Sequence, residues 1–396
     1  MAENLSGRPV LDGLRVQKVV FSTGQMAFTI VEPDGHVHEA ADRYLKTFTV
    51  GTARTYAYML VDHLRWLRRE GLTIETVSAA HLSRYMAALG AKFRGPYGTP
   101  WRAGKKPYSQ SALVTAASCL KGFYVHLGSR GTRRDLATEL NQTRLPTKLD
   151  RRRKFLGHTV TGVSGNPLSP SRSVRRHPKL PPQHARETLV AAALTARDRM
   201  AITWLADGGF RVGELCGLHL VDLHLRANAV CGQCKSRHVH ICHRELNPNG
   251  SRVKTKVDWT LSDGVVIGGA IRRVSPAMVH SYFEYMTTEY PPNADHGMLF
   301  VQLHGAQSGG PWAASALRGM LARTSHRAGI GLVKPHALRH QFATDVLSAA
   351  GGNALIARDA GGWASASTVE EIYGHVDVDD PVFSSALERV WRENER

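Results

Sequence analysis

The sequence has few of the features that mark secreted or membrane proteins. It contains only five cysteines in 396 residues, an odd and small number, so we expect a reduced, cytoplasmic protein and no disulfide framework. No run of about 18 apolar residues occurs, so we expect no membrane-spanning helix. The first residues lack the basic and then apolar pattern of a secretory signal. Secreted disulfide scaffolds and membrane proteins are therefore disfavoured.

Acidic residues are also scarce relative to basic ones. The chain has 33 aspartate and glutamate residues against 51 lysine and arginine residues, which gives a formal net charge of +18. Such an excess says little about the fold. It predicts a polyanionic partner, which could be DNA, RNA or an acidic membrane surface.

The length exceeds that of a single ordinary core and predicts two domains with connecting segments. We interpret residues 1–39 as an N-terminal extension and residues 40–142 as a small helical domain. Its helices are expected at 51–69, 79–89 and about 110–127, from apolar residues at helical spacing. Ser78 is the expected N-cap of the second helix and Gly90 its stop, while Gly128 ends the third. Residues 91–108 form a basic loop with aromatic residues.

Residues 143–183 have no persistent hydrophobic period and are predicted to be a linker. The segment contains the basic run Arg151-Arg152-Arg153-Lys154 and several glycine, serine and proline residues. The run suits either a solvated tether or contact with backbone phosphates, and the sequence leaves both open.

Residues 184–396 are predicted to form a second domain of mixed composition. Helices are expected at 184–206, at 211–220 and over most of the chain after 276. Between them, residues 228–275 alternate valine, isoleucine, histidine and threonine, with turns at 247–250 and 262–264, which predicts a small antiparallel sheet. The fold class is therefore mainly α with a small antiparallel β-sheet in the second domain.

Three short motifs of this second domain carry candidate chemistry. In the first, Arg211 follows a Gly-Gly break and precedes Glu214 by three residues, so on a helix the carboxylate can orient the guanidinium. An oriented guanidinium suits a pair of phosphate oxygens. Taken alone, the motif is weak and favours a surface arginine.

The second motif is Lys334-Pro335-His336-Ala337-Leu338-Arg339-His340. His336 and Arg339 are three residues apart at the start of a predicted helix, whose free N–H groups and partial positive charge favour a phosphate. The alternative interpretation is a capping histidine and a solvated arginine.

The third motif is Gly361-Gly362-Trp363, followed ten residues later by Tyr373 in front of Gly374-His375. A tyrosine in this position can simply pack against its neighbours. It can also attack phosphorus when nearby cations stabilise the charge on the phosphoryl oxygens.

Together, in this order, the three motifs resemble those of the tyrosine recombinase (phage integrase) family. The segments GGFRVGELCGLHLVDL and HALRHQFATDVLSAAGG resemble its two arginine helices, and 34 residues separate Arg339 from Tyr373, a spacing that the family tolerates. The resemblance covers about 180–385. By position and basic helices, the helical domain is similar, though more weakly, to the family's core-binding domain.

The resemblance implies a role for each motif residue. Arg211 and Arg339 would clamp the scissile phosphate, and His336 would hydrogen-bond it and assist proton movement. Trp363, at a position where many members have histidine, would support the same phosphate. Tyr373 would attack and leave a 3′-phosphotyrosine and a free 5′-hydroxyl. The resemblance implies neither a metal nor another cofactor in this reaction.

A lysine on a β-strand of the family protonates the leaving oxygen, and this sequence offers two. Lys254 and Lys256 lie two residues apart, so on a strand both would point to the same face. We prefer Lys254, because the residues after Asn247-Pro248-Asn249-Gly250 look like the strand-turn segment of the family.

The predicted sheet also contains a cluster of possible metal ligands. Cys231 and Cys234 form a Cys-x-x-Cys pair, and Cys242-His243 follow, which together make a zinc-like set. Neighbouring residues on a strand face opposite sides, so Cys242 and His243 fit one tetrahedral site poorly. We therefore favour buried structural cysteines over a zinc site.

The resemblance further implies a C-shaped clamp of the two domains around double-stranded DNA, with four protomers acting on paired sites. The segment after Tyr373 has apolar residues at helical spacing and would dock on a neighbouring protomer or on its own domain. Two alternatives remain at this point. A type IB topoisomerase shares the chemistry, and an inactive DNA-binding relative could keep the fold, although no motif position is lost.

Overall fold

The computed structural model describes residues 13–90, 106–148, 151, 157–159, 161–170, 179–373 and 385. The chain divides into two compact units, Met1–Arg175 and Arg176–Arg396, which are described separately here. The division falls inside the segment 143–183 that the sequence predicts as a linker.

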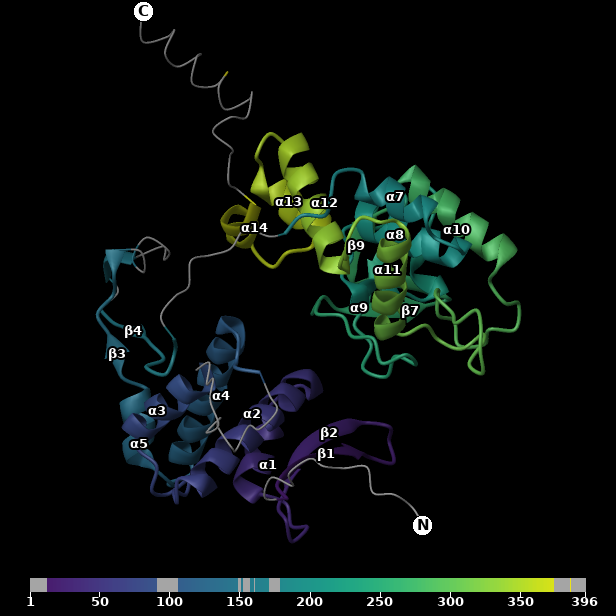
Figure 1. The fold of residues 1–396 in the computed structure, drawn as a ribbon. Helices are drawn as coiled ribbons and strands as arrows, with labels where there is room; N and C mark the ends of the chain where they lie inside the picture. The colour runs from purple at the N-terminus through teal and green to yellow at the C-terminus, as the bar shows by residue number, and fades with distance from the viewer. Residues whose placement is uncertain are drawn as a thin grey trace, which may run out of the picture. The chain divides into compact units, whose positions relative to one another are not determined.

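The first unit contains a β-hairpin in addition to its helices (Figure 1). Strands β1 (Arg15–Val20) and β2 (Met26–Val31) pair in antiparallel register, with Arg15 opposite Val31. Leu14 and Ile30 are fully buried in the same core as the helices. The interpretation of residues 1–39 as an extension therefore fails for the described part. The pattern concealed the hairpin because most side chains of β1 are exposed, and the hairpin packs against both α1 and α2.

Three helices of the first unit begin and end close to the predicted positions, while its short first and fifth helices were not predicted. The helices are α1 (Glu39–Leu45), α2 (Val50–Arg69), α3 (Ala79–Gly90), α4 (Gln110–Ser129) and α5 (Arg134–Leu140). The hydroxyl of Ser78 accepts from the backbone N–H of His81, as expected of an N-cap. Gly128 lies inside α4 and does not end it. A Cβ there would lie 2.3 Å from the Cβ of Ala137, so this glycine permits α5 to pack closely. Most of the predicted basic loop, residues 91–105, lies outside the described residues.

Part of the predicted linker belongs to the first unit. Strands β3 (Thr143–Arg144) and β4 (Val163–Ser164) pair with each other, and a 3₁₀ turn, η2, spans Gly157–Thr159. Leu168 is buried in the core of this unit. The prediction of a segment without regular structure is therefore wrong for these residues. The two strands have only two residues each, which is too short to produce an alternation of apolar and polar residues in the sequence.

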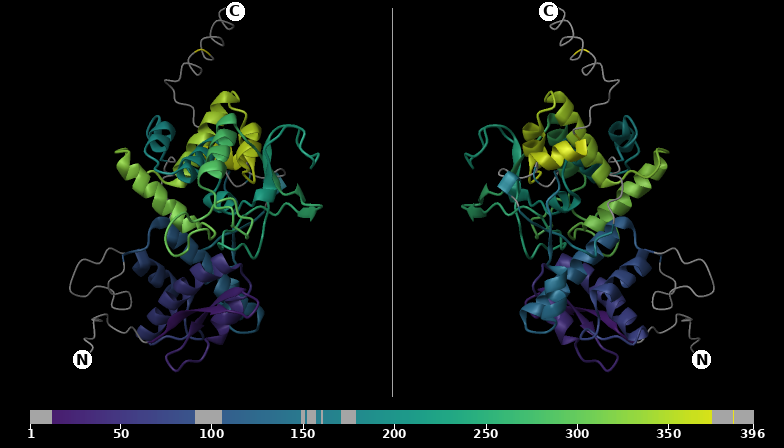
Figure 2. Two further views of the ribbon diagram at one scale, coloured as in Figure 1. Left: turned by 90° about the vertical axis from the view of Figure 1, so that its right-hand side faces the viewer. Right: turned by 90° about the vertical axis from the view of Figure 1, so that its left-hand side faces the viewer.

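The second unit is a helical assembly with two small antiparallel sheets, which confirms the predicted fold class (Figures 1 and 2). Its helices are α7 (Ala185–Ala191), α8 (Ala196–Asp207), α9 (Val212–Cys216), α10 (Pro276–Thr288), α11 (Ala314–Arg327), α12 (Pro335–Ala349), α13 (Ala354–Gly361) and α14 (Ala366–Tyr373), with a 3₁₀ turn η3 (Leu220–Asp222). Its strands are β5 (Leu223–His224), β6 (His238–Ile241), β7 (Trp259–Ser262), β8 (Val265–Gly268) and β9 (Ala270–Arg273).

The strands form a three-stranded sheet, in the order β5-β6-β9, and a separate β7-β8 hairpin. The predicted turn at 262–264 joins β7 to β8, and Asp263 and Gly264 both have positive φ angles, of 49° and 76°. Two residues in the left-handed region match the twist of a hairpin. The predicted turn at 247–250 lies instead in a stretch, 242–258, that forms no strand.

Helix α8 lies at the centre of the main core of the second unit, between α10 and α12. Trp204, Phe210 and Phe300 are fully buried there. A smaller core joins α12, α13 and α14 and includes Val369 and Tyr373. The described part of the chain has no helix that is long and apolar enough to cross a membrane.

Candidate active site

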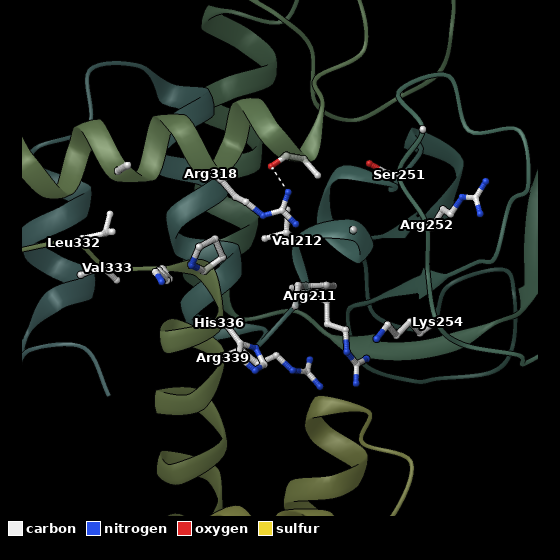
Figure 3. Close-up of a pocket in the computed structure, with 17 residues that line it drawn as sticks. Arg211, Val212, Ser251, Arg252, Lys254, Arg318, Leu332, Val333, His336 and Arg339 are labelled. Carbon is white, nitrogen blue, oxygen red and sulfur yellow. Dashed lines mark hydrogen bonds between the residues drawn. The ribbon is translucent and has the colours of Figure 1, made fainter. Parts of the chain in front are cut away.

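A cleft of about 740 Å³ in the second unit brings together four of the six predicted catalytic residues. Arg211, Lys254, His336 and Arg339 all line it. Figure 3 shows their nitrogen atoms converging from three separate segments of the chain. Residues that are far apart in sequence thus form one cationic site.

Arg211 is held by a carboxylate of its own helix. It is the N-cap of α9, and its Nη1 donates to Oε1 of Glu214 at 2.5 Å, while its backbone N–H donates to Oε2 at 3.0 Å. Glu214 is only 2% exposed. The predicted orientation of Arg211 by Glu214 is therefore present, and its cause is local because the two residues are three apart on one helical turn.

Arg339 is almost completely buried, with 1% of its surface exposed. Its Nη1 donates to the carbonyl of Gly209 and lies 3.9 Å from Oε2 of Glu214. Its guanidinium stacks over the ring of Trp363 at 4.0 Å. Its Nη2 has no hydrogen-bond partner within the described residues.

Burial and neighbouring positive charge make Arg339 an unusual arginine. Desolvation, assisted by the positive charge of Arg211, lowers its pKa to about 10. A buried cation with an unused N–H is costly unless an anion binds to it. The second predicted arginine is therefore suited to a phosphate, and the alternative of a solvated surface side chain is excluded by its burial.

A third arginine, Arg272 on β9, joins this group and was not identified from the sequence. It is 5% exposed, and its Nε has no partner in the described structure. Burial lowers its pKa. It lies so close to Gly362 that a Cβ at this glycine would be 1.4 Å from its Nη2. The available signal was the strand period, which puts Arg272 on the same face as buried Val274.

His336 lies in the first turn of α12, after Pro335, as predicted. Burial, together with the positive charges of Arg339, Arg211 and Lys254, lowers its pKa below the ordinary value. The free site therefore favours a neutral imidazole, which can accept or donate one proton. An anion in the cleft would reverse part of this effect.

The structure distinguishes the two candidate lysines. Lys254 lines the cleft and Lys256 does not. The expectation that both lie on one face of a strand is wrong, because residues 251–258 form no strand. The segment instead passes close to α9, where a Cβ at Gly213 would meet the carbonyl oxygen of Arg252 at 2.4 Å. This close approach carries Lys254 to the cleft.

Trp363 and Tyr373 lie next to the cleft but are not among its lining residues. Their rings are 5.7 Å apart between centroids and nearly perpendicular, at 76°. Tyr373 is 8% exposed and ends α14. Burial raises the pKa of its hydroxyl, and the positive charges of Arg339 and Arg211 oppose this rise.

The Tyr373 hydroxyl is 2.6 Å from Nδ1 of His340, a residue that the sequence argument did not select. Burial, with the adjacent His336, lowers the pKa of His340 to about 4. A neutral His340 can accept the hydrogen bond of the tyrosine hydroxyl. The signal was available, because His340 is one helical turn after His336 and their rings are 4.1 Å apart.

The predicted cysteine set is not brought together. All five cysteines are free. Within the described residues, the group of possible metal ligands includes Cys231 but neither Cys234, Cys242 nor His243. The Nδ1 atom of His243 instead lies 2.9 Å from the carbonyl oxygen of Val253.

The chemistry of the cleft is that of an anion-binding site with a nearby oxygen nucleophile. Four arginines and two lysines line the cleft, and the Glu214 carboxylate pairs with one of them, Arg211. Guanidinium groups match pairs of phosphate oxygens.

Comparisons with known proteins show which family this chain is similar to. The sequence profile of the Phage integrase family matches residues 182–379, half of the chain. Transposase A from transposon Tn554 of Staphylococcus aureus is 25% identical over 203 residues, which are 51% of this chain and 50% of that protein. The same match occurs in strains Mu50 and N315. The chain thus spans about half the length of the curated relatives it matches.

Two solved structures share the fold. The XerH site-specific recombinase bound to its difH substrate has a TM-score of 0.54 at 15% identity, over 87% of this chain and 80% of that one. The Tn1549 transposon integrase in complex with transposon right end DNA has a TM-score of 0.54 at 16% identity, over 89% and 99%. With the family profile covering the segment that holds the cleft, the chain belongs to the phage integrase family, the tyrosine recombinases.

Proposed function

We propose that this protein is a site-specific DNA recombinase that cuts and rejoins DNA strands through a 3′-phosphotyrosine intermediate. The observation that carries the proposal is the cleft itself, in which Arg211, Lys254, His336 and Arg339 converge beside Tyr373. Each group has a role in a transesterification at phosphorus.

Double-stranded DNA is the proposed substrate. The net charge of +18 suits a polymer of phosphates, whose contacts with lysine and arginine give salt-dependent affinity regardless of sequence. The XerH structure is bound to a palindromic difH substrate, and the Tn1549 integrase structure is a complex with transposon right end DNA.

In the proposed cleavage step, the Tyr373 oxygen attacks the scissile phosphorus and the bond to the 5′-oxygen breaks. Arg211 and Arg339 hold the non-bridging oxygens and stabilise the charge that develops on them. His336 hydrogen-bonds the same phosphate, and Trp363 supports Arg339 by stacking on it. These cations take the part that Mg²⁺ takes in other phosphoryl transfers.

Two protons must move in this step. The tyrosine proton leaves toward His340, whose Nδ1 already faces the hydroxyl at 2.6 Å. Lys254 donates a proton to the departing 5′-oxygen. The reverse reaction, with a 5′-hydroxyl from another strand, rejoins the DNA without an external energy source. Exchange between two duplexes requires two cuts in each, so we propose a homotetramer on paired sites.

The test of this function is the substitution Tyr373→Phe, which removes only the attacking oxygen. The variant should bind DNA as the unmodified protein does, because its ring still packs in the same place. It should form no covalent protein–DNA complex on a nicked suicide substrate, measured as a slower-migrating band under denaturing conditions. A covalent band that survives in Tyr373→Phe would show that another residue is the nucleophile.

Analysis of the products tests recombination itself. Incubation with two target sites should give recombinant joints, sequenced across each junction. Relaxation of any supercoiled plasmid without such joints would instead indicate a topoisomerase.

A further inference from the structure

Three histidines and a cysteine of the small sheet form a second cluster, which is separate from the residues lining the cleft. They are His224, Cys231, His238 and His240, and their ligand atoms all lie within 4.8 Å of one another. Cys231, His238 and His240 are buried, and His224 is half-buried.

The antiparallel register explains how three histidines reach one point. His224 on β5 is paired directly with His238 on β6, so their side chains lie on the same face. His238 and His240 are two residues apart on one strand and therefore share that face. The residues between and after them, Val239 and Ile241, point into the core on the other face. Cys231 reaches the cluster from the loop between β5 and β6.

The outer nitrogen atoms of two of these rings are fixed by the backbone. Nδ1 of His238 lies 2.7 Å from the carbonyl oxygen of Ser236, and Nδ1 of His240 lies 2.5 Å from that of Gly268. A carbonyl oxygen only accepts, so each Nδ1 carries the proton and donates it. Each Nε2 then has no proton and offers a lone pair. Proteins orient histidine ligands toward a metal in the same way, with the other ring N–H donated to a carbonyl or carboxylate oxygen.

The two lone pairs face each other, which is unfavourable unless a cation lies between them. Nε2 of His238 is 3.1 Å from Nε2 of His240 and 3.2 Å from Sγ of Cys231. The Cys231 thiol has one proton and can satisfy only one of these nitrogens. Nε2 of His224 is also buried and has no hydrogen-bond partner in the described structure. The cluster therefore has more acceptors than donors at its centre.

The separations of 3.1 and 3.2 Å are close to those of a tetrahedral metal site, and the other ligand atoms lie within 4.8 Å of one another. Zinc bonds of about 2.0–2.1 Å to nitrogen and about 2.3 Å to sulfur place neighbouring ligand atoms roughly 3.3–3.7 Å apart. Three imidazoles and one thiolate supply four protein ligands of the nitrogen and sulfur types that zinc prefers, the number found in a closed tetrahedral site.

We propose that His224, Cys231, His238 and His240 bind one zinc ion, which fixes the sheet of the second unit. This ligand set differs from the Cys-x-x-Cys set considered from the sequence, because only Cys231 is shared. Two hydrogen bonds to Gly268 tie the cluster to the β7-β8 hairpin. Nδ1 of His240 donates to the Gly268 carbonyl oxygen, and the Gly268 backbone N–H donates to Oε1 of Gln233 at 2.8 Å. The zinc would therefore join the β5-β6 loop, β6 and the hairpin that follows the Lys254 segment.

The experiment measures the metal content of the full-length chain. After equilibrium dialysis against Zn²⁺ and then against metal-free buffer, elemental analysis should give about one zinc per chain. Replacement of zinc by Co²⁺ should give the visible absorption of a tetrahedral site together with a thiolate-to-cobalt band. Cys231→Ser should remove the thiolate band, and His240→Ala should lower zinc affinity by at least about 100-fold, since even outer partners of metal ligands are worth 10–100-fold.

Matched controls come from the neighbouring candidates. Cys234→Ser and His243→Ala should keep the full zinc content and the cobalt spectrum. His224 is the half-buried ligand, so His224→Gln should disturb the packing least of the ligand substitutions. Circular dichroism checks that this variant is folded. A folded unmodified chain that retains no zinc would overturn the proposal and indicate a protonated histidine cluster. Equal zinc loss in Cys231→Ser and Cys234→Ser would overturn the ligand assignment.

Discussion

At the residue scale, the candidate site has more positive charge than its own carboxylate balances. Glu214 pairs with Arg211 and lies 3.9 Å from Arg339, while Arg272 adds a third guanidinium close by. Buried like charges destabilise the free protein unless an anion lies between them. The second unit therefore holds its cations in place before a phosphate arrives, which is the arrangement that stabilises a developing charge most effectively.

The two lysines provide a prediction at this scale. Lys254→Ala should slow cleavage by about 10²–10⁴-fold, the usual range for a general acid. A substrate with sulfur in place of the 5′-bridging oxygen needs little protonation, so it should restore cleavage by this variant. The rate of covalent complex formation on both substrates is the measurement.

Lys256→Ala is the matched control for Lys254→Ala. Lys256 is two residues after Lys254 and carries an equal charge, but its side chain does not line the cleft. Lys256→Ala should cut the ordinary substrate at nearly the unmodified rate. Sulfur rescue in Lys256→Ala but not in Lys254→Ala would reverse the assignment.

At the scale of elements, the end of α13 sets the position of two arginines. Gly362 caps this helix with a φ of 64°, and its carbonyl oxygen accepts from Arg211. The Arg272 guanidinium occupies the space where a Cβ would be. Gly362→Ala should therefore displace Arg272 and lower the rate of covalent complex formation by at least about tenfold, in addition to the left-handed strain of about 1–2 kcal/mol.

Gly352, just after α12, supplies the control for this change. Its φ is 84°, and a Cβ there would meet nothing within 4 Å. Gly352→Ala should lower the melting temperature through the same backbone strain without changing the cleavage rate. If Gly352→Ala slows cleavage as much as Gly362→Ala does, the effect of Gly362→Ala is one of stability alone.

In the first unit, the contact between α2 and α4 should depend on pH. His63 is fully buried on α2, and its Nε2 is 2.7 Å from the Tyr124 hydroxyl on α4. Burial lowers its pKa to about 3. An unfolded chain, with a histidine pKa of about 6.5, takes up this proton first as the pH falls. The stabilisation is therefore present above pH 6.5 and is lost as the pH falls toward 3. The loss amounts to about 2 kcal/mol by pH 5.

Hydrogen exchange of the α2 amides measures this effect within the intact chain. Protection should fall between pH 7 and pH 5, after correction for the intrinsic exchange rate. His63→Gln should remove most of the fall, while His36→Gln, at an exposed position, should leave it unchanged. An unaltered pH dependence in His63→Gln would assign the loss of protection to other groups.

At the scale of the whole molecule, each of the two units has a hydrophobic core of its own. The proposed catalytic residues all lie in the second unit, while the basic helix α2 belongs to the first. We propose that the first unit holds the duplex and that the second carries out the chemistry.

A fragment that begins at Arg176 tests this division of labour. Because phosphate contacts dominate affinity, the fragment should bind DNA far more weakly and with a shallower dependence on salt than the full chain. It should still cut slowly at high DNA concentration, since it retains every proposed catalytic residue. Binding of both proteins is measured over a salt series, after circular dichroism has confirmed that the fragment is folded. Equal affinity and equal salt slope would show that the first unit does not touch DNA.

The sequence by itself determined the features that depend on near neighbours in the chain. Helices such as α2 and α3 follow from apolar spacing and the Ser78 cap, and the Arg211–Glu214 pair follows from one turn of helix. The order of the motifs was enough to indicate the family. These features were predictable because their interactions span only three or four residues.

The tertiary structure alone decided what depends on segments that meet from far apart. It placed Lys254 in the cleft and left Lys256 outside it, because the segment that carries them is fixed by its approach to α9 and not by strand pairing. It also added Arg272 to the site and brought His224 opposite His238. The contacts of an irregular segment or a two-residue strand leave no period in the sequence, so only packing between distant residues fixes them.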